Sequence, residues 1–144
     1  MLRTIHKKML GEHENILKML DDFQKSSNNS PKELEKTFSK FKWNLEKHFF
    51  IEEKVIFHIY NSPKEIENFD ILSLLKEHKD ILWIINSIED DFPKNFNSQI
   101  EELKKILKAH ATFENEYFYP RLDEELNEEQ KQLILERIEE IIRE

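Results

Sequence analysis

Apolar residues recur every three or four positions along most of the chain, which is the spacing of amphipathic helices. Prolines and turn-forming residues interrupt this pattern and divide the chain into four long helices and a short last one. We expect helices over residues 3–25, 31–60, 63–91 and 97–120, and a short one after Asn127. No segment shows the alternation typical of a strand. The pattern therefore predicts an all-α protein.

Two of the expected helix starts carry the same signal: a serine, a proline next to it, and a glutamate three positions after the serine. These residues are Ser30, Pro31 and Glu33, and then Ser62, Pro63 and Glu65. The third helix is expected to be irregular between Asn68 and Asp70 and to break at Phe92–Pro93. The fourth should end near Pro120, and Asn127 with Gln130 should cap the last helix.

The short connections make successive helices antiparallel neighbours, so we predict an up-and-down antiparallel four-helix bundle with a short C-terminal fifth helix. The fifth helix is expected to cover the bundle with one apolar stripe, made of Leu133, Ile134, Ile138, Ile141 and Ile142. A length of 144 residues suits a single domain over residues 1–144.

Composition limits the partners and the chemistry. The formal net charge of −8, without a basic stripe, argues against nucleic acid as a partner. There is no cysteine, so disulfides, iron–sulfur clusters and thiolate zinc sites are excluded. Neither a signal peptide nor a membrane-spanning stretch is encoded, so we expect a cytoplasmic protein that is not bound to a membrane.

Histidines and glutamates recur in a pattern that makes one half of the chain resemble the other. Each half has a Glu–His pair followed by a histidine with a glutamate four residues later. The first half reads Glu12–His13 and His48-x-x-x-Glu52, and the second reads Glu77–His78 and His110-x-x-x-Glu114. The chain is therefore interpreted as one helix hairpin used twice.

The repeated histidines and glutamates lie within apolar helix stripes. Residues four apart share one face of a helix, roughly 6 Å apart along its axis, so His48 and Glu52 can reach one inward point, as can His110 and Glu114. Burying such groups costs several kcal/mol unless they are paired or coordinated. A single histidine of this kind is more often an ordinary core residue. The joint pattern favours a two-metal site.

Other residues near this pattern are weighed individually. Tyr117 lies three residues after Glu114 and is a candidate proton donor to the site, although such a tyrosine is more often part of the core. Glutamates adjoining the proposed ligands should face solvent, because sequence neighbours point about 100° apart on a helix. These are Glu12, Glu53 and Glu77, and we expect His6 and His58 to be surface residues as well.

Several known site types are disfavoured. The Glu-x-x-His spacing of ferritin-like di-iron proteins is absent, since leucine stands three residues before each of the four histidines. The His-Glu-x-x-His motif of zinc proteases and a Gly-rich phosphate loop are absent too.

In the order and spacing of these motifs, nearly the whole chain resembles the hemerythrin-like family of cation-binding four-helix bundles. The resemblance implies a non-heme di-iron centre with an oxo or hydroxo bridge. It implies that His13 and His48 bind one iron, that His78 and His110 bind the other, and that Glu52 and Glu114 bridge both. Histidine and carboxylate also accept manganese and zinc, so the residues themselves leave the metal open.

The chain differs from the oxygen-carrying hemerythrins at two positions. Leu74 stands where they have a further histidine, and Asn115 stands where they have the last carboxylate, with Glu114 one residue earlier. The chain is therefore closer to the symmetric subgroup with four histidines and two glutamates. Counting donors leaves each metal five-coordinate, so both metals are expected to be similar and to have room for a small ligand.

Three classes of function fit this site. The leading hypothesis is a protein that binds or senses dioxygen, nitric oxide or peroxide. The second is a di-iron enzyme that consumes peroxide or nitric oxide with a redox partner, or a protein that donates iron to damaged iron centres. The third is an interaction module that has lost the chemistry. The sequence does not decide whether the protein is an enzyme.

Overall fold

The computed structural model describes residues 4–25, 30–60, 65–91 and 96–143. Almost all of these residues are helical, and the described part of the chain contains no strand. Two segments, η1 and η2, are π-helices, in which each turn is wider by about one residue. The elements are α1 (Ile5–Lys25), α2 (Pro31–Ile51), η1 (Glu52–Ile56), α3 (Phe57–Ile59), α4 (Glu65–Asp91), α5 (Phe96–Phe113), η2 (Glu114–Phe118), α6 (Tyr119–Glu125) and α7 (Glu128–Arg143).

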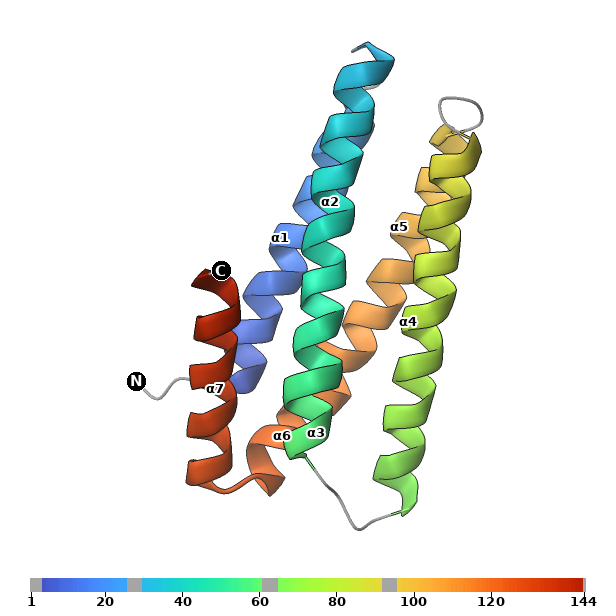
Figure 1. Ribbon diagram of the computed structural model, residues 1–144. Helices are drawn as coiled ribbons and strands as arrows, with labels where there is room; N and C mark the ends of the chain where they lie inside the picture. Colours follow the sequence, from blue (N-terminus) through green and yellow to red (C-terminus); the bar gives the residue numbers. More distant parts are fainter. Residues whose placement is uncertain (1–3, 26–29, 61–64, 92–95, 144) are drawn as a thin grey trace.

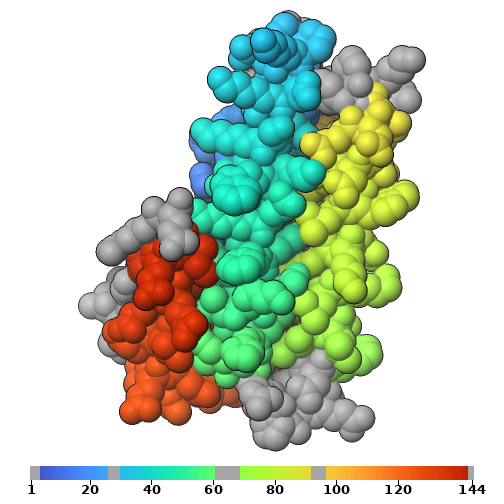
Figure 2. Space-filling view, in the orientation of Figure 1, coloured from blue at the N-terminus to red at the C-terminus, as the bar shows by residue number. Residues whose placement is uncertain are grey.

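The four long helices α1, α2, α4 and α5 form the predicted up-and-down bundle (Figure 1). Helix α1 packs against both α2 and α5, and α4 packs against α5. Helix α7 follows the bundle and lies against α1 and η1, where Figure 2 shows it beside the lower half of α2. The all-α class and the C-terminal fifth helix are thus confirmed.

Two of the predicted helix caps form. The Ser30 hydroxyl accepts a hydrogen bond of 3.3 Å from the Glu33 amide, and Pro31 is in the first turn of α2. At the start of α7, the Gln130 amide donates to Asn127 Oδ1 at 2.8 Å, while the Asn127 amide donates to Gln130 Oε1 at 3.0 Å. This reciprocal pair is a full capping box. The start signal at residues 61–64 and the break at 92–93 lie outside the described residues.

Two expectations about helix continuity are wrong. Helix α4 runs without interruption through residues 68–70. The fourth long helix does not end near Pro120 but continues through it as α6 to Glu125. A proline inside a regular helix would collide with the carbonyl four residues before it. Here Pro120 is the second residue of α6 and lies two residues after the end of η2, in a first helical turn, where proline is tolerated.

The core consists of two clusters of buried residues. One contains Phe23, Phe38 and Ile85, and the other contains Ile5, Phe118 and Tyr119 from the opposite half of the bundle. Helix α7 contributes Ile134 and Ile138 to the second cluster. The predicted stripe is wrong at Leu133, which is 40% exposed. The histidines of the repeat lie between the two clusters along the helices.

Candidate metal centre

All six residues singled out as metal ligands are buried inside the bundle. Each long helix contributes one histidine, and the glutamates are the first residues of the two π-helices. The exposed fraction of each residue is at most 5%: His13 5%, His48 3%, Glu52 0%, His78 1%, His110 4% and Glu114 0%. The helices therefore bring the predicted set together from four separate parts of the chain.

Each glutamate connects the two histidine pairs. Glu52 Oε1 lies 3.2 Å from Nε2 of His48 and 3.3 Å from Nε2 of His78. Glu114 Oε1 lies 3.1 Å from Nε2 of His13 and 3.2 Å from Nε2 of His110. Within the first pair, the Nε2 atoms of His13 and His48 are 3.1 Å apart. Each carboxylate thus lies between one histidine of the first hairpin and one of the second.

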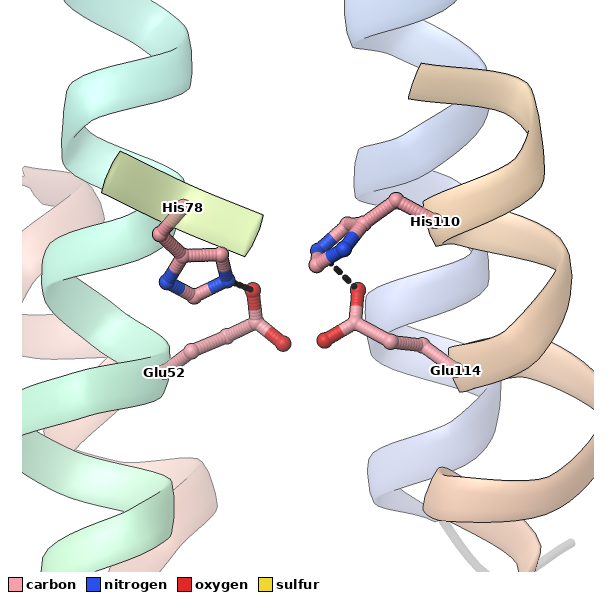
Figure 3. A group of neighbouring side chains, drawn as sticks. All are labelled: Glu52, His78, His110 and Glu114. Atoms are coloured by element: carbon pink, nitrogen blue, oxygen red, sulfur yellow. Dashed lines mark ion pairs between the residues drawn. The ribbon is translucent and has the colours of Figure 1, made fainter. Parts of the chain in front are cut away.

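Figure 3 shows how four of these side chains converge. The carboxylates of Glu52 and Glu114 point toward each other from opposite sides of the bundle, and the imidazoles of His78 and His110 turn their nitrogens toward them. These four residues offer ligand atoms that all lie within 4.8 Å of one another. His13, His48 and Glu114 form a second such group. Glu114 belongs to both, as a bridging carboxylate would.

The donor atoms of the centre fit a metal ion. Two ligands bound to one ion at about 2.0–2.2 Å lie at most about 4.4 Å apart, close to the spacing in both groups. Several of the inward atoms are buried without a hydrogen-bond partner although carboxylate and imidazole lie within contact distance. They are Glu52 Oε1, His78 Nε2, His110 Nε2 and both carboxylate oxygens of Glu114. Buried polar atoms are rarely left unpaired, so such a cluster is compatible with a cation-binding site.

The π-helices position the carboxylates. The Phe57 amide donates to the Glu52 carbonyl, and the Tyr119 amide donates to the Glu114 carbonyl, so each π-helix begins at a site glutamate and closes five residues later. The two segments occupy equivalent places in the sequence repeat. Single-turn π segments are frequent at functional sites. Nothing in the residue pattern predicted them.

The outward nitrogen of every site histidine also has a partner on a neighbouring helix. The four Nδ1 contacts are His13 with Asn115 Oδ1 at 2.9 Å, His48 with Glu12 at 3.3 Å, His78 with Glu53 at 2.8 Å and His110 with Glu77 at 2.8 Å. Such partners orient a histidine and direct its other nitrogen toward a metal. The expectation that Glu12, Glu53 and Glu77 face solvent holds only in part: their side chains are 21%, 33% and 45% exposed, but each also contacts the outer nitrogen of a site histidine.

Tyr119, and not Tyr117, reaches the centre. The Tyr117 side chain is 58% exposed and contacts Phe113, so it is not placed to donate a proton to the site. The buried Tyr119 hydroxyl donates a hydrogen bond of 2.5 Å to Glu52 Oε2. Burial and the nearby carboxylates of Glu114 and Glu52 raise the pKa of Tyr119 well above its usual value, so the phenol keeps its proton.

Charge compensation shapes the protonation of the metal-free centre. Burial alone would lower the pKa of His48, but the Glu52 and Glu12 carboxylates outweigh it and raise this pKa to about 10. Burial also opposes the charged form of His110, yet Glu114 and Glu77 raise its pKa to about 10. Glu52 is held well below its usual pKa, against the effect of burial, chiefly by His48. Protons therefore occupy imidazole nitrogens that a metal would take.

A small apolar cavity adjoins the centre on one side. Its volume is about 20 Å³, and it is lined by His13, Ile16, Leu17, Leu45, His48, Phe49, Leu107, His110 and Ala111. This is about the space that one water molecule or one diatomic molecule requires. His78 does not line it. Phe49 stacks on the His78 ring with centroids 3.8 Å apart.

The sequence profile of one protein family, described as the Hemerythrin HHE cation binding domain, matches residues 4–122. The chain belongs to this family. The match covers the four long helices and both carboxylate-bearing π segments, and hence all six candidate ligands of this hemerythrin-like protein. Curated proteins and solved structures gave no significant match.

The family assignment and the buried cluster together support a hemerythrin-like protein with a metal-ion site. The His/Glu cluster predicted from the sequence is compatible with a site of the di-iron type. In the part of the chain that the structure describes, no helix is long and apolar enough to cross a membrane.

Proposed function

We propose that this hemerythrin-like protein holds two iron ions and binds a small ligand, such as dioxygen, nitric oxide or peroxide, beside them. The observation that carries the proposal is a group of buried carboxylate oxygens and imidazole nitrogens that have no hydrogen-bond partner and converge next to a cavity of about 20 Å³. The metal-ligand atoms supply a metal site, and the cavity provides room beside it for a ligand of a few atoms.

The roles of the residues follow from their contacts. His13 and His48 would hold one ion, His78 and His110 the other, and the two glutamates would bridge them, because each glutamate contacts one histidine of each pair. A bound iron pair supplies reversible electron transfer to the small ligand. The protein side chains orient the donors and exclude water from the centre.

The Tyr119 phenol supports a second candidate, an enzyme that consumes peroxide or nitric oxide. Its hydroxyl proton lies on a hydrogen bond to Glu52 in a fully buried position. In this role the phenol would orient Glu52 and serve as a hydrogen-bond donor beside the centre, while an added reductant would supply the electrons. Reversible binding needs no reductant, so multiple turnover with an added reductant distinguishes the enzyme from the sensor or carrier.

Reconstitution tests the metal and the ligand separately. Metal-free protein is loaded with Fe²⁺ without oxygen, its iron content is measured, and absorption spectra are recorded as oxygen, nitric oxide or peroxide is added. We expect two irons per chain and a new absorption band with at least one ligand. Less than stoichiometric iron contradicts the dimetal site. Two irons with spectra unchanged by all three ligands contradict only the ligand proposal.

A further inference from the structure

The outer partners of the histidines follow the internal repeat. Glu12 contacts Nδ1 of His48 on the next helix, and Glu77 contacts Nδ1 of His110 in the same way. Each of these glutamates directly precedes the site histidine of its own helix. The two contacts are therefore equivalent, and both acceptors are carboxylates.

The other two partners are also equivalent in position, but they differ in charge. Glu53 directly follows Glu52 and contacts Nδ1 of His78, while Asn115 directly follows Glu114 and contacts Nδ1 of His13. The repeat thus places an amide on His13 where it places a carboxylate on His78. Among the four site histidines, His13 has the neutral partner.

This difference changes the strength of a ligand. A histidine bound to a metal through Nε2 keeps its proton on Nδ1 and donates it to the outer partner, and a carboxylate acceptor makes the imidazole a more basic ligand. A neutral amide oxygen increases the basicity of the imidazole less, because charge-assisted hydrogen bonds are roughly twice as strong as neutral ones. His13 should therefore be a weaker donor than His78.

Two further departures from the repeat occur around His13. Phe49 stacks on His78, and its counterpart in the second half is Ala111, which lines the cavity beside His13. Phe57 stacks near His78 at 6.2 Å between ring centroids, and its counterpart Tyr119 is 5.6 Å from His13. The environments of His13 and His78 thus differ in charge, packing and polarity, although the candidate ligands themselves repeat.

We propose that Asn115 is a positioning residue that weakens metal binding at the His13/His48 position relative to the His78/His110 position. The inference rests on the proposed dimetal site. It means that the two ions are inequivalent, and that the His13/His48 position fills second and empties first. This differs from the two similar metals that the sequence repeat predicts.

Stepwise titration of the metal-free protein with Co²⁺ tests the proposal, because its visible spectrum reports binding without redox chemistry. Asn115→Asp preserves the shape of the side chain and adds the charge. We expect it to lower the larger of the two Co²⁺ dissociation constants about tenfold. Glu53→Gln removes the charge from the equivalent partner and should raise the smaller dissociation constant about tenfold. Both changes bring the two constants together, from opposite directions.

Single-position variants identify which ion responds. With His78→Ala the metal is confined to the His13/His48 position, where adding Asn115→Asp should tighten Co²⁺ binding about tenfold. With His48→Ala it is confined to the other position, where Asn115→Asp should change binding less than threefold. Asn15→Asp adds the same charge on an exposed position two residues from His13 and controls for general attraction.

The outcomes separate this inference from the proposed function. If the unaltered protein binds no Co²⁺, the dimetal site itself fails. If it binds two ions and Asn115→Asp changes neither constant, or changes both equally, the inference fails while the site stands. Thermal unfolding of the metal-free variants checks the fold; a change in that stability without the selective shift in one Co²⁺ constant indicates a merely structural role and overturns the inference.

Discussion

The phenol of Tyr119 donates a hydrogen bond of 2.5 Å to Oε2 of Glu52, a residue 67 positions earlier in the chain. The bond joins the first residue of α6, directly after η2, to the first residue of η1, so it connects the places where the two π segments lie in the repeat. It fixes the orientation of one candidate bridging carboxylate and leaves Glu52 Oε1 directed at His48 and His78. Tyr119 is therefore part of the centre although it offers no ligand atom.

Replacing Tyr119 by phenylalanine should destabilise the metal-free protein by about 1.5–3 kcal/mol, because a buried ionised carboxylate loses its donor. Urea unfolding at pH 7 measures this change. Tyr117→Phe is the matched control, since the exposed Tyr117 hydroxyl makes no contact with the centre, and it should cost less than about 0.5 kcal/mol. Equal effects of the two substitutions would contradict the assigned role.

The contrast between these tyrosines shows what the sequence could predict. Regular helical spacing identified the six candidate ligands because His48 with Glu52, and His110 with Glu114, share a helix face. It then selected Tyr117, three residues after Glu114, as the inward phenol. The π turn adds about one residue per turn, which exposes Tyr117 and brings Tyr119 inward. Hydrophobic periodicity contains no signal for such a local change.

The outer partners of the histidines were missed for a different reason. On their own helices Glu12, Glu53 and Glu77 do point away from the inward stripe, as neighbours of the site residues must. A residue at the flank of one helix nevertheless faces the next helix in a bundle, where it meets the outer nitrogen of another histidine. Pairings between helices of this kind depend on packing, which a single sequence does not specify. A Glu–His repeat in both halves was the available signal.

Removing one candidate ligand should remove metal in a position-dependent way. His48→Ala and His110→Ala are each expected to lose about one metal ion per chain, because each histidine belongs to one pair. Glu52→Ala should weaken the binding of both ions, since Glu52 Oε1 contacts a histidine of each pair. Metal analysis after gel filtration provides the measurement.

His58→Ala is the control for these ligand variants, because His58 is exposed and lies on the same helical segment of the chain as His48. It should retain the stoichiometry of the unaltered protein. Retention of two tightly bound ions in His48→Ala and His110→Ala would refute the ligand assignment.

Filling the cavity should hinder the small ligand and spare the metals. Ala111→Val adds two carbons at the cavity wall beside His110, at a cost in stability of about 1–3 kcal/mol from overpacking. We expect unchanged iron content but at least tenfold slower nitric oxide binding, followed by stopped-flow absorption. Ala109→Val is a control on the exposed side of the same helix. Equal binding rates in both variants would exclude the cavity as the ligand site.

The stability of the metal-free protein should decrease as the pH rises above neutrality. The carboxylates around His48 and His110 raise the pKa of each to about 10, against a value near 6.5 in the unfolded chain. The folded state thus binds more protons than the unfolded state between these values. The resulting stabilisation is fully present below about pH 6.5 and is lost as the pH rises through 10.

Urea unfolding of the metal-free protein between pH 7 and pH 9.5 should show this loss, at up to about 1.4 kcal/mol per pH unit for each imidazole. His48→Gln removes one of the two groups and should reduce the slope, whereas His58→Gln should not. In the metal-loaded protein the same nitrogens would hold ions instead of protons, so the slope of the unfolding free energy against pH should disappear. For the same reason, metal binding at pH 8 should release protons, which a pH-sensitive dye in weak buffer detects. A metal-free protein whose stability stays constant from pH 7 to pH 9.5 would contradict the raised pKa values. Metal binding without proton release would show that the ions do not occupy these imidazoles.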